Sequence, residues 1–130
     1  MPAAPRVMSV SVFAAAPHGS SDVLREINQM RLAMEYVTLV HRTPPHYLLG
    51  PSRGGKHLSS SRQTLQYICH VAFGMNYTRI GELTNRDRTS VSYACRQIEA
   101  LRDFNEIDKS LFFAEMALQA MMHHLSEPQS

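Results

Sequence analysis

The most informative part of this 130-residue chain is residues 86–101, which read Arg86-Asp87-Arg88-Thr89-Ser90-Val91-Ser92-Tyr93-Ala94-Cys95-Arg96-Gln97-Ile98-Glu99-Ala100-Leu101. The segment begins with polar, mainly basic residues, and apolar residues then recur at positions 91, 94, 95, 98 and 101. This spacing predicts a helix with one buried face. The polar side chains of its first turn are of types that hydrogen-bond base edges and phosphates. We therefore interpret the segment as a candidate recognition helix for double-stranded DNA.

The composition indicates a single globular domain without a membrane span. Hydrophobic residues make up 44% of the chain and charged residues 18%, and no apolar run approaches the roughly 20 residues that cross a bilayer. Cys69 and Cys95 fall at apolar positions of predicted helices, so we expect buried free thiols rather than a disulfide, in a cytoplasmic, nucleoid-associated protein. The seven histidines lack metal-ligand spacing, and we expect neither a metal nor a cofactor.

Positive charge is concentrated around the candidate helix. The whole chain carries a net charge of only +2. Residues 50–102 contain eight Lys and Arg against three Asp and Glu, which gives +5, whereas residues 103–130 contain one against five, which gives −4. This segregation favours a polyanionic partner over an ordinary solvated basic surface.

Apolar spacing and capping residues predict the other elements. Three longer helices are expected at residues 20–41, about 60–73 and about 106–125, and two shorter ones at residues 44–49, capped by Thr43, and residues 76–83, capped by Asn76. Residues 1–19 are rich in Ala and Pro and are expected to form a disordered tail rather than a signal peptide. Residues 51–61 are expected to form a basic loop that contains Arg53 and Lys56.

The order short helix, Thr84-Asn85 turn, longer basic helix is typical of a helix-turn-helix. We therefore predict an all-α fold, with a compact helical DNA-binding domain over residues 20–105 and an extra C-terminal helix over residues 106–125. Apolar residues of that last helix stand at positions 107, 111, 114, 118, 121 and 125. It either docks on the domain or forms a homodimer.

Residues 50–57 come close to the phosphate-binding loop of nucleoside triphosphatases. They match GxxxxGK, but His57 stands where the motif requires a Ser or Thr that binds magnesium. No strand is predicted before them, and no nucleophile and base stand in a catalytic arrangement. We interpret the match as chance and expect that the protein is not an enzyme.

A more specific pattern extends over residues 62–102. The motifs are Arg62-Gln63, Ile80-Gly81, residues 86–91 and Ala94-Cys95-Arg96-Gln97-Ile98-Glu99. They closely resemble the C-terminal DNA-binding domain of the bacterial chromosomal replication initiator DnaA, whose signature is RQ, IG, RDHTTV and HACRKIE. The resemblance extends over roughly residues 23–105. The chain contains no complete Walker motif, so we expect a stand-alone domain without the initiator's ATPase.

The resemblance implies contacts in both grooves of DNA. The segment that starts at Arg86 would begin the recognition helix, with Asp87, Arg88 and Thr89 near base edges and Ser90 at a phosphate. Asp87 is equally suited to capping its own helix, and Tyr93, Arg96 and Gln97 either extend this surface or are simply exposed. The loop before the RQ helix would enter the minor groove, through Arg53 and Lys56. Positions at or near the DNA backbone are matched by Arg62, Gln63 and Thr78.

The chain departs from the family pattern at the tip of the recognition helix. Arg88 replaces a histidine, which favours bidentate contact with guanine. The turn before Arg86 is one residue shorter and lacks paired glycines, and Gly54, beside Arg53, stands at the minor-groove arginine position. We therefore expect a different recognition sequence from that of the initiator.

Three functions are compatible with these patterns. The first is a small, sequence-specific transcriptional regulator that binds double-stranded DNA. The second is a replication-control protein that competes for initiator sites, and the third is a protein-interaction adaptor on the same fold. No membrane partner is expected, and a homodimer through residues 106–125 is left open.

Overall fold

The computed structural model describes residues 20–50 and 55–126, and these form six helices and no strand. The helices are α2 (Ser20–His41), α3 (Pro45–Leu49), α4 (Lys56–Phe73), α5 (Tyr77–Thr84), α6 (Arg88–Leu101) and α7 (Asn105–Ser126). The all-α prediction is confirmed. The predicted tail at residues 1–19 and the predicted contact residue Arg53 lie outside the described residues. Within the described part, no helix has the length and apolarity that a bilayer span requires.

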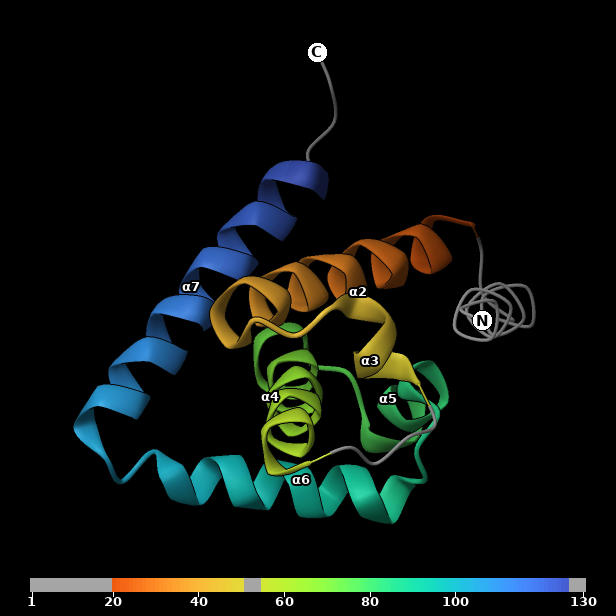
Figure 1. Ribbon diagram of the computed structural model, residues 1–130. Coiled ribbons are helices and arrows are strands. Elements are labelled where there is room, and N and C mark those ends of the chain that lie inside the picture. The colour runs from red at the N-terminus through yellow and green to blue at the C-terminus, as the bar shows by residue number, and fades with distance from the viewer. Residues whose placement is uncertain (1–19, 51–54, 127–130) are drawn as a thin grey trace.

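Helix α4 lies at the centre of the molecule, with α2 and α6 on either side of it and α7 alongside (Figure 1). Its residues Leu65 and Ile68 are fully buried, as are Val37 of α2, Ile80 of α5 and Val91 of α6. Burial of such side chains contributes about 1.5–3 kcal/mol each. The shared core therefore holds the helix-turn-helix, α5 and α6, firmly against α4.

A side-chain cap marks the start of each helix of the helix-turn-helix. Asn76 caps α5 by accepting a hydrogen bond from the Arg79 amide at 2.8 Å, as the sequence predicts. Asp87 caps α6 by accepting from the Ser90 amide at 3.1 Å. Asn85 ends α5 in a left-handed conformation (φ 59°), which asparagine tolerates better than most residues. A short turn without paired glycines is therefore compatible with this sequence.

The turn also requires a glycine at position 81. The Arg86 amide donates to the Gly81 carbonyl at 2.9 Å, which brings the turn back over α5. A Cβ at position 81 would lie closer to the Arg86 carbonyl oxygen than van der Waals contact allows. Gly81 therefore permits the close approach that sets the position of Arg86.

Two boundaries differ from the sequence prediction. Helix α4 begins at Lys56, about four residues early, so Lys56 lies in a helical turn and not in a loop. Thr43 does not cap α3, since Pro44 stands at the N-cap and Pro45 begins the helix. The Thr43 hydroxyl instead hydrogen-bonds Ser61 at 2.8 Å, which ties the start of α3 to α4.

Helix α7 packs against α4 and α2. Its buried residues are Leu111, Ala114, Leu118 and Met122. The predicted apolar face is wrong at its end, because Met121 and Leu125 are 49% and 53% exposed. The last turns of α7 project beyond the other helices in Figure 1, so few side chains are available to cover them.

An arginine cluster fastens the beginning of α7. We use this name for Arg102, Tyr67, Asp108 and Glu115. Arg102 Nε donates to Asp108 at 2.6 Å, and its Nη1 donates to Glu115 at 2.5 Å and to the Tyr67 hydroxyl at 3.0 Å. Charge-assisted bonds of this kind are the stronger class of hydrogen bond. They connect the end of α6 to both α4 and α7.

Candidate nucleic-acid interface

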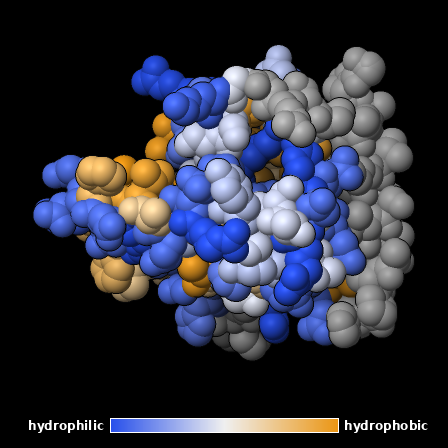
Figure 2. All heavy atoms as spheres, turned by 90° about the horizontal axis from the view of Figure 1, so that it is seen from below, coloured by the Kyte–Doolittle hydropathy of each residue, from blue (hydrophilic) through white to orange (hydrophobic). Residues whose placement is uncertain are grey.

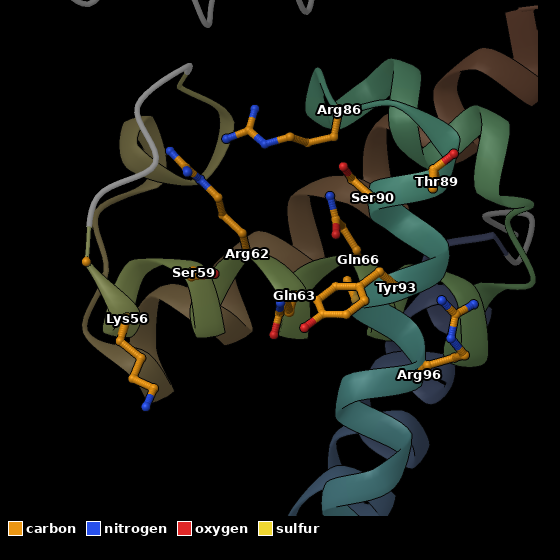
Figure 3. A pocket seen from close by; sticks show the side chains of 12 residues that line it. Lys56, Ser59, Arg62, Gln63, Gln66, Arg86, Thr89, Ser90, Tyr93 and Arg96 are labelled. Atoms are coloured by element: carbon orange, nitrogen blue, oxygen red, sulfur yellow. The ribbon is translucent and has the colours of Figure 1, made fainter.

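A groove of about 910 Å³ lies between the first half of α4 and the outer side of α6 (Figure 3). Its lining residues are Gly55, Lys56, Ser59, Arg62, Gln63, Gln66, Arg86, Thr89, Ser90, Tyr93, Ala94 and Arg96. Four of them are basic, and none of the described lining residues is acidic. A concave surface with one sign of charge raises the local concentration of oppositely charged ligands. The groove is therefore suited to a polyanion.

Two arginines, which we call the arginine pair, meet at one end of the groove. Arg62 Nη2 and Arg86 Nη2 both donate to the Gly50 carbonyl, at 3.1 and 3.0 Å. Arg62 also donates to the Tyr47 carbonyl through Nε and Nη2, at 3.1 and 2.9 Å. Figure 3 shows the two side chains extending toward each other. These bonds fix the residue after α3 against both α4 and the turn before α6.

The positive charges of the two arginines in the pair repel each other. Burial, and then the charge of Arg86, lower the pKa of Arg62. Arginine nevertheless keeps its charge at any physiological pH. Carbonyl oxygens orient a guanidinium group but carry no formal charge, so a nearby phosphate would stabilise both arginines.

The α6 wall of the groove presents a polar helical face. Thr89, Ser90 and Tyr93 project from it, and the ring of Tyr93 extends toward Gln63 of α4 (Figure 3). Tyr93 is 52% exposed. The spacing of these residues is that of one side of a helix, opposite the buried side that contains Val91. An exposed aromatic ring beside hydroxyl and amide groups can pack on sugars or bases as well as hydrogen-bond phosphates.

A second, shallower hollow of about 460 Å³ lies at the tip of the helix-turn-helix. Thr78, Glu82, Asp87 and Arg88 are among its lining residues, together with Arg86, which therefore borders both hollows. Arg88 is exposed in the first turn of α6. The tip thus presents a cation and a capping carboxylate side by side.

The structure distributes the predicted contact residues over these two connected hollows. The groove contains Lys56, Arg62, Gln63, Arg86, Thr89 and Ser90, and the tip contains Thr78, Arg86, Asp87 and Arg88. Their contacts with DNA stay predictions. Arg62 differs from the others because it is only 7% exposed and holds backbone carbonyls, which favours a positioning role.

The groove is also lined by residues outside the predicted contact set, among them Ser59, Tyr93 and Arg96. The sequence left Tyr93 and Arg96 open between groove and plain surface, because nothing local indicates that α4 lies opposite them. Gln97, the third residue of that set, does not line the groove. Ser59 carried no signal beyond belonging to a serine-rich segment.

The described residues contain no group of three or more potential ligands that could hold a metal ion. Among known protein families, the one described as bacterial DnaA protein helix-turn-helix matches residues 32–98 of the chain. This range covers just over half of the chain, extends from α2 into α6, and excludes α7. No curated protein matches the chain.

Proposed function

The chain belongs to the bacterial DnaA helix-turn-helix family, and on that premise we propose that it is a small, sequence-specific regulator of transcription. A domain of this family binds DNA through its helix-turn-helix. The observation that carries the proposal is the groove, which has four basic and no acidic side chains among its described lining residues and continues into the exposed tip of α6.

In this proposal the first turn of α6 enters the major groove. Arg88 is exposed at the tip, and a guanidinium group suits the O6 and N7 atoms of guanine. Asp87 caps α6 with one carboxylate oxygen and offers the other to a base amino group, while Thr89 approaches base edges. Ser90 contacts a phosphate. These few groups read the sequence.

The side chains of α4 and the turn contact the DNA backbone. Lys56 stands in the first turn of α4, and its ammonium is well placed to meet a phosphate. Arg86 reaches the same strand from the other wall of the groove, and Arg62 positions it through Gly50. Thr78 and Gln63 supply neutral hydrogen bonds. Phosphate contacts of this kind set orientation and give affinity that falls with salt.

A homodimer through residues 106–125 is part of the proposal. The outer face of α7 carries Phe112, Phe113 and Met116, which are 52%, 73% and 53% exposed. Pairing of two α7 helices through this face would cover these exposed apolar side chains in both copies. Sedimentation of the full chain tests this, since a monomer at micromolar concentration would contradict it.

We further infer a cytoplasmic, nucleoid-associated location.

Selection of duplexes from a random pool with the full chain tests the proposed function. We expect enrichment of a defined site containing guanine, and we expect Arg88→Ala to relax the preference at one position by about 1–3 kcal/mol. Arg31→Ala, on exposed α2 surface away from the groove, is the matched control. Recovery of the replication initiator's own sites would instead support competition at those sites. No enrichment and no duplex binding at low salt would overturn the proposal in favour of a protein-interaction adaptor.

A further inference from the structure

A separate cavity of about 290 Å³ lies where α2, α4, α6 and α7 meet. It shares no lining residue with the DNA groove. Apolar side chains form most of its surface, among them Val40, Leu101 and Ile107. Val40 and Leu101 remain 54% and 37% exposed at its rim, so an occupant would bury apolar surface that the fold leaves uncovered. Taking the roughly 30 Å³ that a water molecule occupies, the volume suits a body of about ten non-hydrogen atoms.

Polar groups line part of this cavity, at exposed and partly buried positions. Tyr36, Ser60 and Ser110 line it, and within the described part of the chain their hydroxyl groups make no hydrogen bond. Glu106, in the first turn of α7, also lines the cavity and forms no ion pair with a described residue. An apolar pocket with a few convergent polar groups is the usual form of a small-molecule site.

The charge of the cavity selects the kind of ligand. Glu106 supplies a carboxylate, and no Lys or Arg is among the described lining residues. His41 also lines the cavity, but burial, and then the nearby His57, lower its pKa, which disfavours a positive charge on its ring. A cationic group is therefore favoured and an anionic group is disfavoured.

We propose that this cavity binds a small primary amine with an apolar, aliphatic or aromatic body, whose ammonium group pairs with Glu106. The body fills the apolar space, and the hydroxyls of Ser60 and Ser110 accept further N–H bonds. Helix α7, which lies outside the matched residues 32–98, contributes Glu106, Ile107 and Ser110. The site is thus a property of this chain's added helix.

The cavity and the groove share the helices α4 and α6, so an occupant of the cavity can affect DNA binding. This inference rests on the proposed function. Ser60 and Thr64 of α4, and Ile98 and Leu101 of α6, line the cavity, and the same two helices form the walls of the groove. When the amine and DNA each favour a particular separation of α4 and α6, the amine changes the affinity for DNA, and DNA changes the affinity for the amine by the same factor. The cavity is then an effector site.

Titration of the ¹⁵N-labelled full chain with 2-phenylethylamine, followed by amide chemical shifts, tests the binding. We expect saturable shifts at Ser60, Ile98 and Ser110, and at least tenfold weaker binding of 3-phenylpropionate, which has a similar body and the opposite charge. Glu106→Gln should weaken the amine about tenfold. Asp103→Asn, which removes an exposed carboxylate outside the cavity, should not.

Ser110→Leu gives an independent readout, because it fills the cavity from an exposed position of α7 with little risk to the fold. It should abolish the saturable shifts. Unsaturable shifts, equal affinity for the amine and the carboxylate, or an unchanged affinity in Glu106→Gln would overturn the proposal. Duplex affinity with and without saturating amine tests the coupling, which a constant affinity would overturn. Absence of duplex binding in the amine-free protein would contradict the proposed function alone and leave the shifts unaffected.

Discussion

The arginine cluster around Arg102 and the arginine pair Arg62 and Arg86 use the same side chain in opposite ways. Arg102 meets two carboxylates and a phenol, whereas the described bonds of the arginine pair go to backbone carbonyl oxygens. Carboxylates cancel the charge of Arg102 within the fold. Carbonyls orient the arginine pair without carrying a formal charge themselves, so we propose that the first cluster serves stability and the second recognition.

The pKa of the arginine is shifted in opposite directions at the two sites, upward at Arg102 and downward at Arg62. Burial alone would lower the pKa of Arg102, but its hydrogen bonds to Tyr67, Asp108 and Glu115 raise it overall. At the arginine pair, burial and then Arg86 lower the pKa of Arg62. The cluster therefore stabilises its cation, and the arginine pair tolerates two cations side by side.

Figure 2, which views the side of the molecule that carries α6, shows a largely hydrophilic surface there, with hydrophobic side chains gathered where α7 begins.

The largest expected effect is that of Gly81→Ala, which displaces the turn before the candidate recognition helix. The new Cβ collides with the Arg86 carbonyl, so the turn must shift and carry Arg86 away from Gly50. We expect the free energy of unfolding to fall by about 3 kcal/mol and duplex affinity to fall with it. Urea unfolding and anisotropy measure the two effects. Gly55→Ala is the control for the unfolding measurement alone, because its Cβ meets no described atom within 4 Å but Gly55 itself lines the groove. An unchanged unfolding midpoint in Gly81→Ala would contradict the assigned turn geometry.

Arg102→Met should separate stability from recognition. The substitution keeps the aliphatic bulk but leaves Asp108 and the largely buried Glu115 without their cation. We expect a loss of about 2 kcal/mol in urea unfolding, less than for a fully buried pair because Asp108 is half exposed. Duplex affinity of the folded protein should stay within about twofold. A large loss of duplex affinity without a loss of stability would reverse the roles of the two sites.

Alkaline pH should weaken the cluster in a defined window. Burial, and then the hydrogen bond to Glu99, raise the pKa of Tyr67 from 10.0 to about 12. The unfolded chain therefore loses this proton before the folded chain does, so the free energy of unfolding falls as pH rises from about 10 to about 12. Urea unfolding across this range measures the slope. Tyr67→Phe should make this slope shallower without removing it, because burial also raises the pKa of the Cys69 thiol to about 12 and that of the Cys95 thiol to about 11. An equally steep slope in that variant would exclude Tyr67 as a contributor.

The sequence predicts those parts of the fold that depend on local signals. The capping residue Asn76 and the apolar spacing of α6 are local, and both helices of the helix-turn-helix begin close to where the sequence places them. The start of α4 is not local. His57 Nε2 lies 2.7 Å from the His41 carbonyl, and Ser61 bonds Thr43, so distant residues support a glycine- and serine-rich turn that has weak helical propensity of its own.

The candidate site shows the same division. The polar tip of α6 can be recognised from the sequence, whereas the roles of Tyr93 and Arg96 depend on the position of α4. The arginine cluster joins side chains as far apart in sequence as residues 67 and 115, and no local pattern brings them together. The choice of Met122 over Met121 as a buried residue is likewise set by how α7 docks.

The salt dependence of duplex binding tests the central claim most directly, namely that the groove between α4 and α6 binds the DNA backbone. Anisotropy of a labelled duplex is measured over a range of salt for the full chain and for two variants that each remove one lysine. Lys56→Ala changes the groove, and Lys109→Ala changes exposed α7 surface outside it. We expect the slope of log affinity against log salt to decrease in magnitude by about one for Lys56→Ala only. Equal slopes for both variants, or no dependence on salt in the unaltered chain, would contradict the claim.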